Sequence, residues 1–177
     1  MDKKAKIAIL GAGIEGLAAA EYLVRNGYKN VTVFDRKDNV DGVIPGDVNA
    51  ALGEDFLEGD DSPLYDYEVL FRSPGIHTNK LDVFRDEGIN VTSTTQFFLE
   101  NCPGKVIGIT GTKGKGTTST LIYEILKKHG VDVYLGGNIG ESPFKFLDSM
   151  GDKSVAVLEL SSFQLQDLTL SPHVAVV

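Results

Sequence analysis

Short apolar runs rich in β-branched residues alternate with stretches of helical spacing through the first part of the chain. Such runs predict strands at 5–10, 31–34, 68–72 and 89–92. Apolar residues spaced as on one helix face predict helices at 16–26 and 81–87. Gly27 and Gly88 stand where those helices should end. Strands that alternate with helices indicate βαβ units, so the pattern predicts an α/β fold with a parallel sheet.

The segment 38–65 interrupts this alternation. It is acidic and contains glycine and proline, which predicts mostly loops with room for one short helix. After residues 101–104, the alternation restarts with strands at 106–110, 131–135, 155–160 and 174–177. The predicted helices between them span 117–129 and a segment from Pro143, with Ser142 as its N-cap. The last run is typical of a buried strand in a parallel sheet.

The restart divides the chain into two predicted domains. Residues 1–100 would form the first domain, 101–105 a hinge, and 106–177 the second. A length of 177 residues fits one domain or two small ones, at roughly 100 to 200 residues per domain. Because nothing follows the strand at 174–177 to finish its sheet, we expect the second domain to be incomplete.

Composition narrows the function. The chain has 25 acidic and 17 Lys or Arg residues, a formal net charge of −8, which disfavours nucleic-acid binding. The lone Cys102 excludes a disulfide framework and fits a reducing cytoplasm. No apolar run approaches the roughly 20 residues of a membrane-spanning helix. We therefore expect a cytoplasmic protein with no membrane or nucleic-acid partner.

A first glycine motif, G-x-G-x-x-G, follows the first strand and opens the first helix. Gly11, Gly13 and Gly16 would let the backbone approach a diphosphate, and the helix N-terminus would offer free N–H groups to it. Asp35 ends the next strand, where it would accept hydrogen bonds from a ribose or a base. This context predicts a Rossmann-like nucleotide-binding domain. The alternative is that these glycines only form a tight turn.

A second glycine-rich segment, 108–118, lies between a strand and a helix. It departs from the strict P-loop pattern, since Ile109 replaces the first glycine and Gly116 stands where a metal-binding hydroxyl is expected. Lys115 would still neutralise β- and γ-phosphates, and Thr117 could supply the hydroxyl to Mg²⁺ one residue late. The segment predicts a P-loop ATPase; a plain surface loop is the alternative.

Glu159 ends the apolar strand predicted at 155–160. Ligands of open α/β sheets sit outside the carboxyl ends of the strands, so this carboxylate is placed to hold Mg²⁺ directly or through water. A strand-end acid that points to solvent is the alternative. Asn138 lies between glycines, where a simple turn is the commoner role.

Several segments in this order resemble the Mur ligases. They are GAGIEG (11–16), SPGI (73–76), GITGTKGKGTT (108–118), GGNIG (136–140) and LELSSFQL (158–165). GGNIG and LELSSFQL downstream of the glycine loop are the specific markers. The resemblance covers essentially the whole chain and implies an ATP-dependent, ADP-forming amide ligase of cytoplasmic peptidoglycan synthesis. In the branch that it resembles, D-glutamate is added to UDP-N-acetylmuramoyl-L-alanine through an acyl phosphate.

The resemblance also implies roles for particular residues. Those near the UDP substrate would be Ile14, Glu15, Gly16, Asp35, Arg36, Gly75, Asn138, Ser161 and Gln164. Those that bind ATP would be Gly111, Thr112, Lys113, Gly114, Lys115, Gly116, Thr117 and Thr118. Lys115 and Glu159 would be catalytic, and Thr117 and Glu159 would hold Mg²⁺.

Two residues depart from the family pattern. Glu15 puts a carboxylate beside the expected diphosphate, which is repulsive unless it turns outward or pairs with Arg36. Lys113 stands where the family usually has asparagine. A modified lysine, a histidine, the adenine contacts and the C-terminal domain that binds the amino acid would all lie beyond Val177.

We therefore expect the 177 residues alone not to ligate, and the complete enzyme to be a monomer. Two other function classes stay open. A nicotinamide-dependent oxidoreductase would explain the first glycine motif and Asp35 but not the later segments. A non-catalytic module that binds a UDP-sugar would use the first domain alone.

Overall fold

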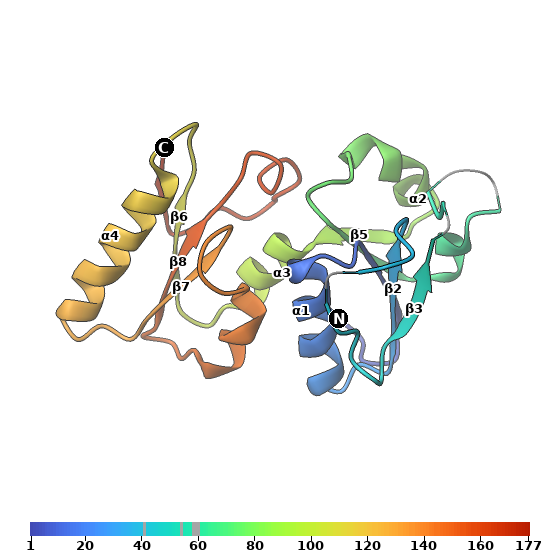
Figure 1. Cartoon of the computed structure of the whole chain (residues 1–177), viewed down its shortest axis with the longest axis horizontal. Coiled ribbons are helices and arrows are strands. Elements are labelled where there is room, and N and C mark those ends of the chain that lie inside the picture. Colours follow the sequence, from blue (N-terminus) through green and yellow to red (C-terminus); the bar gives the residue numbers. More distant parts are fainter. Residues whose placement is uncertain (41, 54, 58–60) are drawn as a thin grey trace. The chain divides into compact units, whose positions relative to one another are not determined.

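The computed structural model describes residues 1–40, 42–53, 55–57 and 61–177. They form two compact units, Met1–Thr94 and Thr95–Val177, each built on a parallel sheet (Figure 1). The predicted α/β class with parallel sheets is confirmed. Positions 41, 54 and 58–60 of the expected loop segment lie outside the described residues. Within the described part, no helix is both long and apolar enough to cross a membrane.

The first unit contains a five-stranded sheet in the order β3-β2-β1-β4-β5, with every neighbouring pair parallel. Its strands are β1 (Lys6–Leu10), β2 (Asn30–Asp35), β3 (Asn49–Leu52), β4 (Val69–Arg72) and β5 (Asn90–Ser93). Its helices are α1 (Ile14–Arg25), the 3₁₀ turns η1 (Pro63–Asp66) and η2 (Thr78–Leu81), and α2 (Asp82–Asp86). Successive strands are added on one side of β1 up to β3 and on its other side from β4 onward. The order therefore switches between β1 and β4, and ligands of such sheets bind at this switch point.

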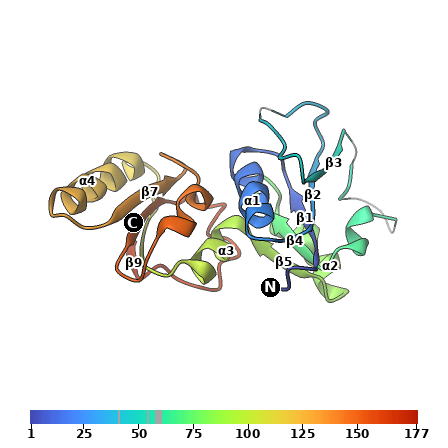
Figure 2. The ribbon, with the colours of Figure 1, turned by 90° about the horizontal axis from the view of Figure 1, so that it is seen from below.

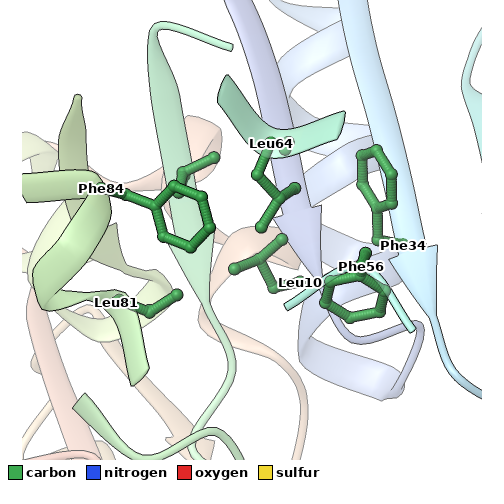
Figure 3. Close-up of a cluster of buried hydrophobic side chains, with 8 residues drawn as sticks. Leu10, Phe34, Phe56, Leu64, Leu81 and Phe84 are labelled. Carbon is green, nitrogen blue, oxygen red and sulfur yellow. The ribbon is translucent and has the colours of Figure 1, made fainter. Parts of the chain in front are cut away.

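Different elements pack on the two faces of this sheet (Figure 2). α1 packs on the face of Ile9, which lies close to Gly16 of that helix. Ala8 and Leu10 point the other way, because successive side chains of a strand alternate between faces. There they join a cluster with Phe34, Leu64 and Phe84, shown in Figure 3. Every residue of this cluster is at most 4% exposed, so it forms the core on that face.

The second unit contains a four-stranded parallel sheet in the order β7-β8-β6-β9. Its strands are β6 (Lys105–Ile109), β7 (Val133–Gly137), β8 (Val155–Glu159) and β9 (Val174–Val176). Its helices are α3 (Thr94–Asn101), α4 (Lys115–Lys128) and the 3₁₀ turns η3 (Pro143–Lys145) and η4 (Leu147–Ser149). α4 runs alongside β7, β8 and β6 (Figure 1).

Three predictions about elements were wrong. The segment from Pro143 forms two 3₁₀ turns rather than one helix, and the Ser142 hydroxyl caps neither. β9 is an exposed edge strand rather than a buried one, and Val174 is 51% exposed. β3 was expected to be loop, because its sequence Asn-Ala-Ala-Leu lacks the β-branched and aromatic residues that strands favour.

The division between the units falls between Thr94 and Thr95, directly after the first residue of α3. Aromatic contacts explain why α3 groups with the second unit. Phe97 stacks on Phe144 with ring centroids 6.1 Å apart, and Phe98 meets Phe146 edge to face at 5.9 Å. The segment 101–105 therefore connects α3 to β6 within the second unit, and its role as a hinge stays a prediction.

We predict that Gly16→Ala destabilises the first unit by about 1–3 kcal/mol, because a Cβ there would collide with the carbonyl oxygen of Gly11. Gly13→Ala is the matched control, since a Cβ at Gly13 meets nothing within 4 Å. Urea unfolding followed by amide NMR signals of the first unit measures both variants. Equal stability of the two variants would contradict the prediction.

Candidate ligand-binding sites

A pocket of about 380 Å³ opens at the carboxyl ends of β1, β2 and β4, beside the switch point of the first sheet. The residues that line it are Leu10, Gly11, Asp35, Arg36, Phe56, Leu57, Ser73, Gly75, Ile76, His77 and Lys80. The lining is partly apolar and also includes a few polar and charged side chains. This combination is typical of small-molecule sites.

The turn from β1 to α1 forms one side of this pocket. Gly11 has a φ of 110°, which favours glycine, and its N–H donates to the carbonyl of Phe34 at 2.7 Å. A Cβ on Gly11 would lie 2.5 Å from the Ser73 hydroxyl oxygen. Gly13 is the N-cap of α1 and brings no side chain to cap the helix. The turn therefore leaves helix N–H groups available to an anion.

Asp35 ties the glycine turn to the end of β2. One carboxylate oxygen accepts a hydrogen bond from the N–H of Ala12 at 2.8 Å, and the other from the N–H of Lys37 at 3.0 Å. Each carboxylate oxygen can accept more than one hydrogen bond. Asp35 therefore supports the turn and still has acceptor capacity for a ligand in the pocket that it lines.

Arg36 lies beside the pocket and pairs with Asp55 at 2.9 Å, so it does not pair with Glu15 as one expectation had it. The N–H of Leu57 and then the Arg36 guanidinium hold the pKa of the Asp55 carboxyl below its usual range. Glu15 lies in the first turn of α1, where its carboxylate accepts a hydrogen bond from the Thr94 hydroxyl at 3.1 Å. That bond gives Glu15 a local role in the first unit.

The second glycine-rich loop connects β6 to α4. Gly111 and Gly114 adopt φ values of 134° and 80°, and Gly114 is the N-cap of α4. The ammonium of Lys115 donates to the carbonyl of Gly111 at 2.9 Å, which folds the lysine over the loop. Thr112 and Lys113 are exposed. The loop thus presents backbone N–H groups and cationic side chains at the carboxyl edge of the sheet.

Glu159 ends β8 beside this loop. It is in register with Ile109 of β6 and Gly137 of β7, and its own carbonyl accepts a hydrogen bond from Asn138 at 3.0 Å. A Cβ on Gly116 would lie 3.2 Å from a carboxylate oxygen of Glu159. The sheet therefore brings Glu159 and Asn138 to the glycine loop.

The Glu159 side chain is only 8% exposed, yet no described residue donates a hydrogen bond to its carboxylate or pairs with it. A carboxylate with little exposure and no protein partner is one whose charge a bound cation would compensate. Across the described residues, no group of three or more His, Cys, Asp or Glu side chains could hold a metal ion. Mg²⁺ bound beside phosphates uses only one or two carboxylates, which Glu159 fits. The hydroxyl of Thr117, in the first turn of α4, is a second candidate ligand.

Ser161 and Gln164 close a turn directly after Glu159. The N–H of Ser161 donates to the Gln164 side chain at 2.8 Å, and the N–H of Gln164 donates to the Ser161 hydroxyl at 3.3 Å. Gln164 is 2% exposed. These two predicted site residues therefore lie near Glu159 in sequence, but the Gln164 side chain shapes its own turn.

Sequence reasoning missed most of the pocket in the first unit. The SPGI segment was noted, but only Gly75 was named as a site residue, whereas Ser73 and Ile76 also line the pocket. Phe56, Leu57, His77 and Lys80 carry no motif that would have pointed to them. Of the predicted residues, Asp35, Arg36 and Gly75 line the pocket, and Ile14, Glu15 and Gly16 belong to the first turn of α1.

Parts of the chain match models of known protein families. Residues 109–177 match the Mur ligase middle domain, and residues 9–53 match an NAD(P)-binding Rossmann-like domain. A UDP-N-acetylmuramate:L-alanyl-γ-D-glutamyl-meso-diaminopimelate ligase from Neisseria meningitides shares the fold, with a TM-score of 0.51 at 19% identity. That match covers 88% of this chain and 52% of the other. The chain is therefore similar to the N-terminal portion of the Mur ligases.

Within that class, the similar curated proteins are UDP-N-acetylmuramoylalanine–D-glutamate ligases. The protein of Acetivibrio thermocellus is 39% identical over 183 residues, and that of Clostridium botulinum strain Hall is 37% identical over 183. Each match covers 99% of this chain. The chain spans 38% of the length of the first relative and 39% of the second. The resemblance to Mur ligases drawn from the motifs is thus confirmed.

We predict that Glu159→Gln stabilises the second unit by about 1 kcal/mol when no nucleotide or Mg²⁺ is present, because it removes a buried charge that no described residue compensates. Glu124→Gln, at an exposed position of α4, should change stability by less than about 0.5 kcal/mol. Thermal unfolding in EDTA compares the two. A loss of stability in Glu159→Gln would contradict the prediction.

Proposed function

We propose that this chain is the UDP-binding domain and the front part of the ATPase domain of a cytoplasmic ligase. The ligase would join D-glutamate to UDP-N-acetylmuramoyl-L-alanine, with ATP and Mg²⁺. The largely buried carboxylate of Glu159 beside the glycine loop carries this proposal, because it is placed to hold Mg²⁺ next to bound phosphates. The similarity to D-glutamate ligases along 99% of the chain supports the choice of substrate.

In the first unit, the substrate's diphosphate would lie at the N-terminus of α1. The N–H groups after Gly13 would hydrogen-bond the phosphate oxygens, and the helix dipole would favour their charge. The uridine would enter the pocket, where Asp35 accepts from its polar groups and Arg36 adds a cation. The Thr94 hydroxyl would hold the Glu15 carboxylate beside this diphosphate and moderate its repulsion.

In the second unit, the loop from Gly111 to Thr118 would bind the ATP phosphates. Lys115 would leave the carbonyl of Gly111 and bind phosphate oxygens, because an anionic acceptor forms the stronger hydrogen bond. Glu159 and Thr117 would hold Mg²⁺, which would neutralise charge on the transferred phosphoryl group. Asn138, Ser161 and Gln164 would contact the muramoyl-alanine part of the substrate.

In the proposed reaction, the alanine carboxylate takes the γ-phosphoryl group of ATP, which yields ADP and an acyl phosphate. The amine of D-glutamate then attacks the acyl carbon, loses a proton, and displaces inorganic phosphate as the amide forms. Lys115 would stabilise the charge on the transferred group, so the contribution of this chain is positioning and electrostatic. In the relatives, about three-fifths of the length lies outside the match.

The match of residues 9–53 to an NAD(P)-binding domain keeps a nicotinamide-dependent oxidoreductase as a second candidate. Asp35 at the end of β2 stands where such domains bind a ribose. A non-catalytic UDP-sugar-binding module differs from the ligase only in the second unit, where it would not bind ATP.

We predict that UDP raises the Tm of the chain and that NAD(H) does not, because only a ligand that binds the folded state stabilises it. Arg36→Met should weaken UDP binding by about tenfold, since it removes a cation that lines the pocket. Arg25→Met, in the last turn of α1, is the control and should leave binding unchanged. Stabilisation by NAD(H) in place of UDP would favour the oxidoreductase.

We predict that Lys115→Met weakens binding of ATP with Mg²⁺ by about tenfold or more, because the lysine lies in the loop that would hold the phosphates. Lys113→Met removes the same charge from an exposed position of that loop and should have a smaller effect. Isothermal titration calorimetry measures both. If the unaltered chain binds UDP but not ATP, the non-catalytic module is favoured.

A further inference from the structure

Arg72 is a fully buried cation that the proposed reaction does not use. It ends β4, in register with Leu10 of β1 and Ser93 of β5, and its exposed fraction is 0%. Alternation along β4 puts its side chain on the same face as Leu70, which belongs to the apolar cluster of the first unit. An arginine remains protonated in proteins, so a permanent charge is buried at the edge of that cluster.

The guanidinium of Arg72 holds the turn that follows β4. Its Nη1 donates to the carbonyl of Ile76 at 2.9 Å and to that of Ser73 at 3.3 Å. The N–H of Ile76 donates to the carbonyl of Ser73 at 3.0 Å. The arginine thus bridges both ends of the turn 73–76. A buried cation needs acceptors and a carbonyl outside the strand ladder needs a donor, so each satisfies the other.

This turn is part of the pocket in the first unit. Ser73, Gly75 and Ile76 line the pocket, whereas Arg72 itself does not. The N–H of Ser73 donates to the carbonyl of Leu10 at 3.2 Å, and its hydroxyl oxygen lies 2.5 Å from where a Cβ on Gly11 would be. A shift of Ser73 would therefore change the packing of the glycine turn at Gly11.

We propose that Arg72 is a positioning residue for the nucleotide pocket of the first unit. Its hydrogen bonds hold the turn 73–76 in place. This turn supplies part of the pocket lining and sets the position of Ser73 against Gly11. One nitrogen, Nη1, donates to both carbonyls, and the rigid guanidinium holds that nitrogen in a fixed orientation that a freely rotating ammonium does not keep. The identity of the ligand rests on the proposed function, whereas the hold of Arg72 on the turn does not.

Arg72→Met tests the proposal, because it keeps an apolar stem and removes all donors. We expect UDP affinity, measured by calorimetry at a temperature where circular dichroism shows the variant folded, to fall at least tenfold. Arg72→Lys should recover part of that loss. Leu23→Ala, a core substitution at a residue of α1 that is 0% exposed, is the control: it should lower the Tm and leave UDP affinity within twofold.

Amide hydrogen exchange in the ligand-free chain gives a second readout. In both Arg72 variants the Ile76 amide should exchange faster relative to the amides of β1, and more so in Arg72→Met. Unchanged relative exchange at Ile76, or UDP affinity within twofold of the parent in Arg72→Met, would overturn the proposal. If the unaltered chain binds no UDP, the proposed ligand fails, and the exchange of Ile76 still decides the role of Arg72. Should Arg72→Met not fold, Arg72→Lys carries the same comparisons.

Discussion

The close approach of backbone segments at the carboxyl edges of the two sheets is the constraint on which both candidate sites depend. In the first unit, Gly16 packs against the carbonyl of Gly11, and Gly11 packs against Ser73. In the second unit, Gly137 and Gly116 lie against the backbone and the carboxylate of Glu159. A side chain at Gly16 or Gly137 would collide with backbone and separate the segments, whereas one at Gly11 or Gly116 would displace the side chain of Ser73 or Glu159. The glycines therefore act through contact distance as much as through backbone freedom.

Local hydrogen bonds make an anion site compatible with a net charge of −8. Three described carboxylates near the pocket of the first unit have donors: backbone N–H groups for Asp35, Arg36 for Asp55, and the Thr94 hydroxyl for Glu15. Donors that stabilise a carboxylate also reduce its field at the ligand. Short-range geometry, rather than the overall charge, then decides what the pocket attracts.

The sequence predicted the elements whose signal is local and left out those that depend on distant contacts. The strand–glycine–helix turns were evident, because their residues are adjacent in the chain and their spacing reflects one geometry. β3 and α3 were missed: β3 gains its stability by pairing with β2, and α3 by packing Phe97 and Phe98 on distant aromatic rings. The helix predicted after Ser142 was wrong for the same reason, since Phe144 and Phe146 of that segment pack on the distant rings of α3. Lys80 and Phe56 also line the pocket, but only the folded structure brings them there, so no local sequence pattern indicated them.

Arg72 and Glu159 show how one physical rule separates two kinds of buried charge. Both side chains lie at strand ends and both are more than nine-tenths buried. The guanidinium of Arg72 has carbonyl acceptors in its own unit, so its desolvation is compensated within the fold. The carboxylate of Glu159 has no such donor among the described residues. Arg72, whose charge the fold satisfies, therefore helps to shape a site. Glu159, whose negative charge has no protein partner in the described part of the chain, is where a bound cation would add the most stability.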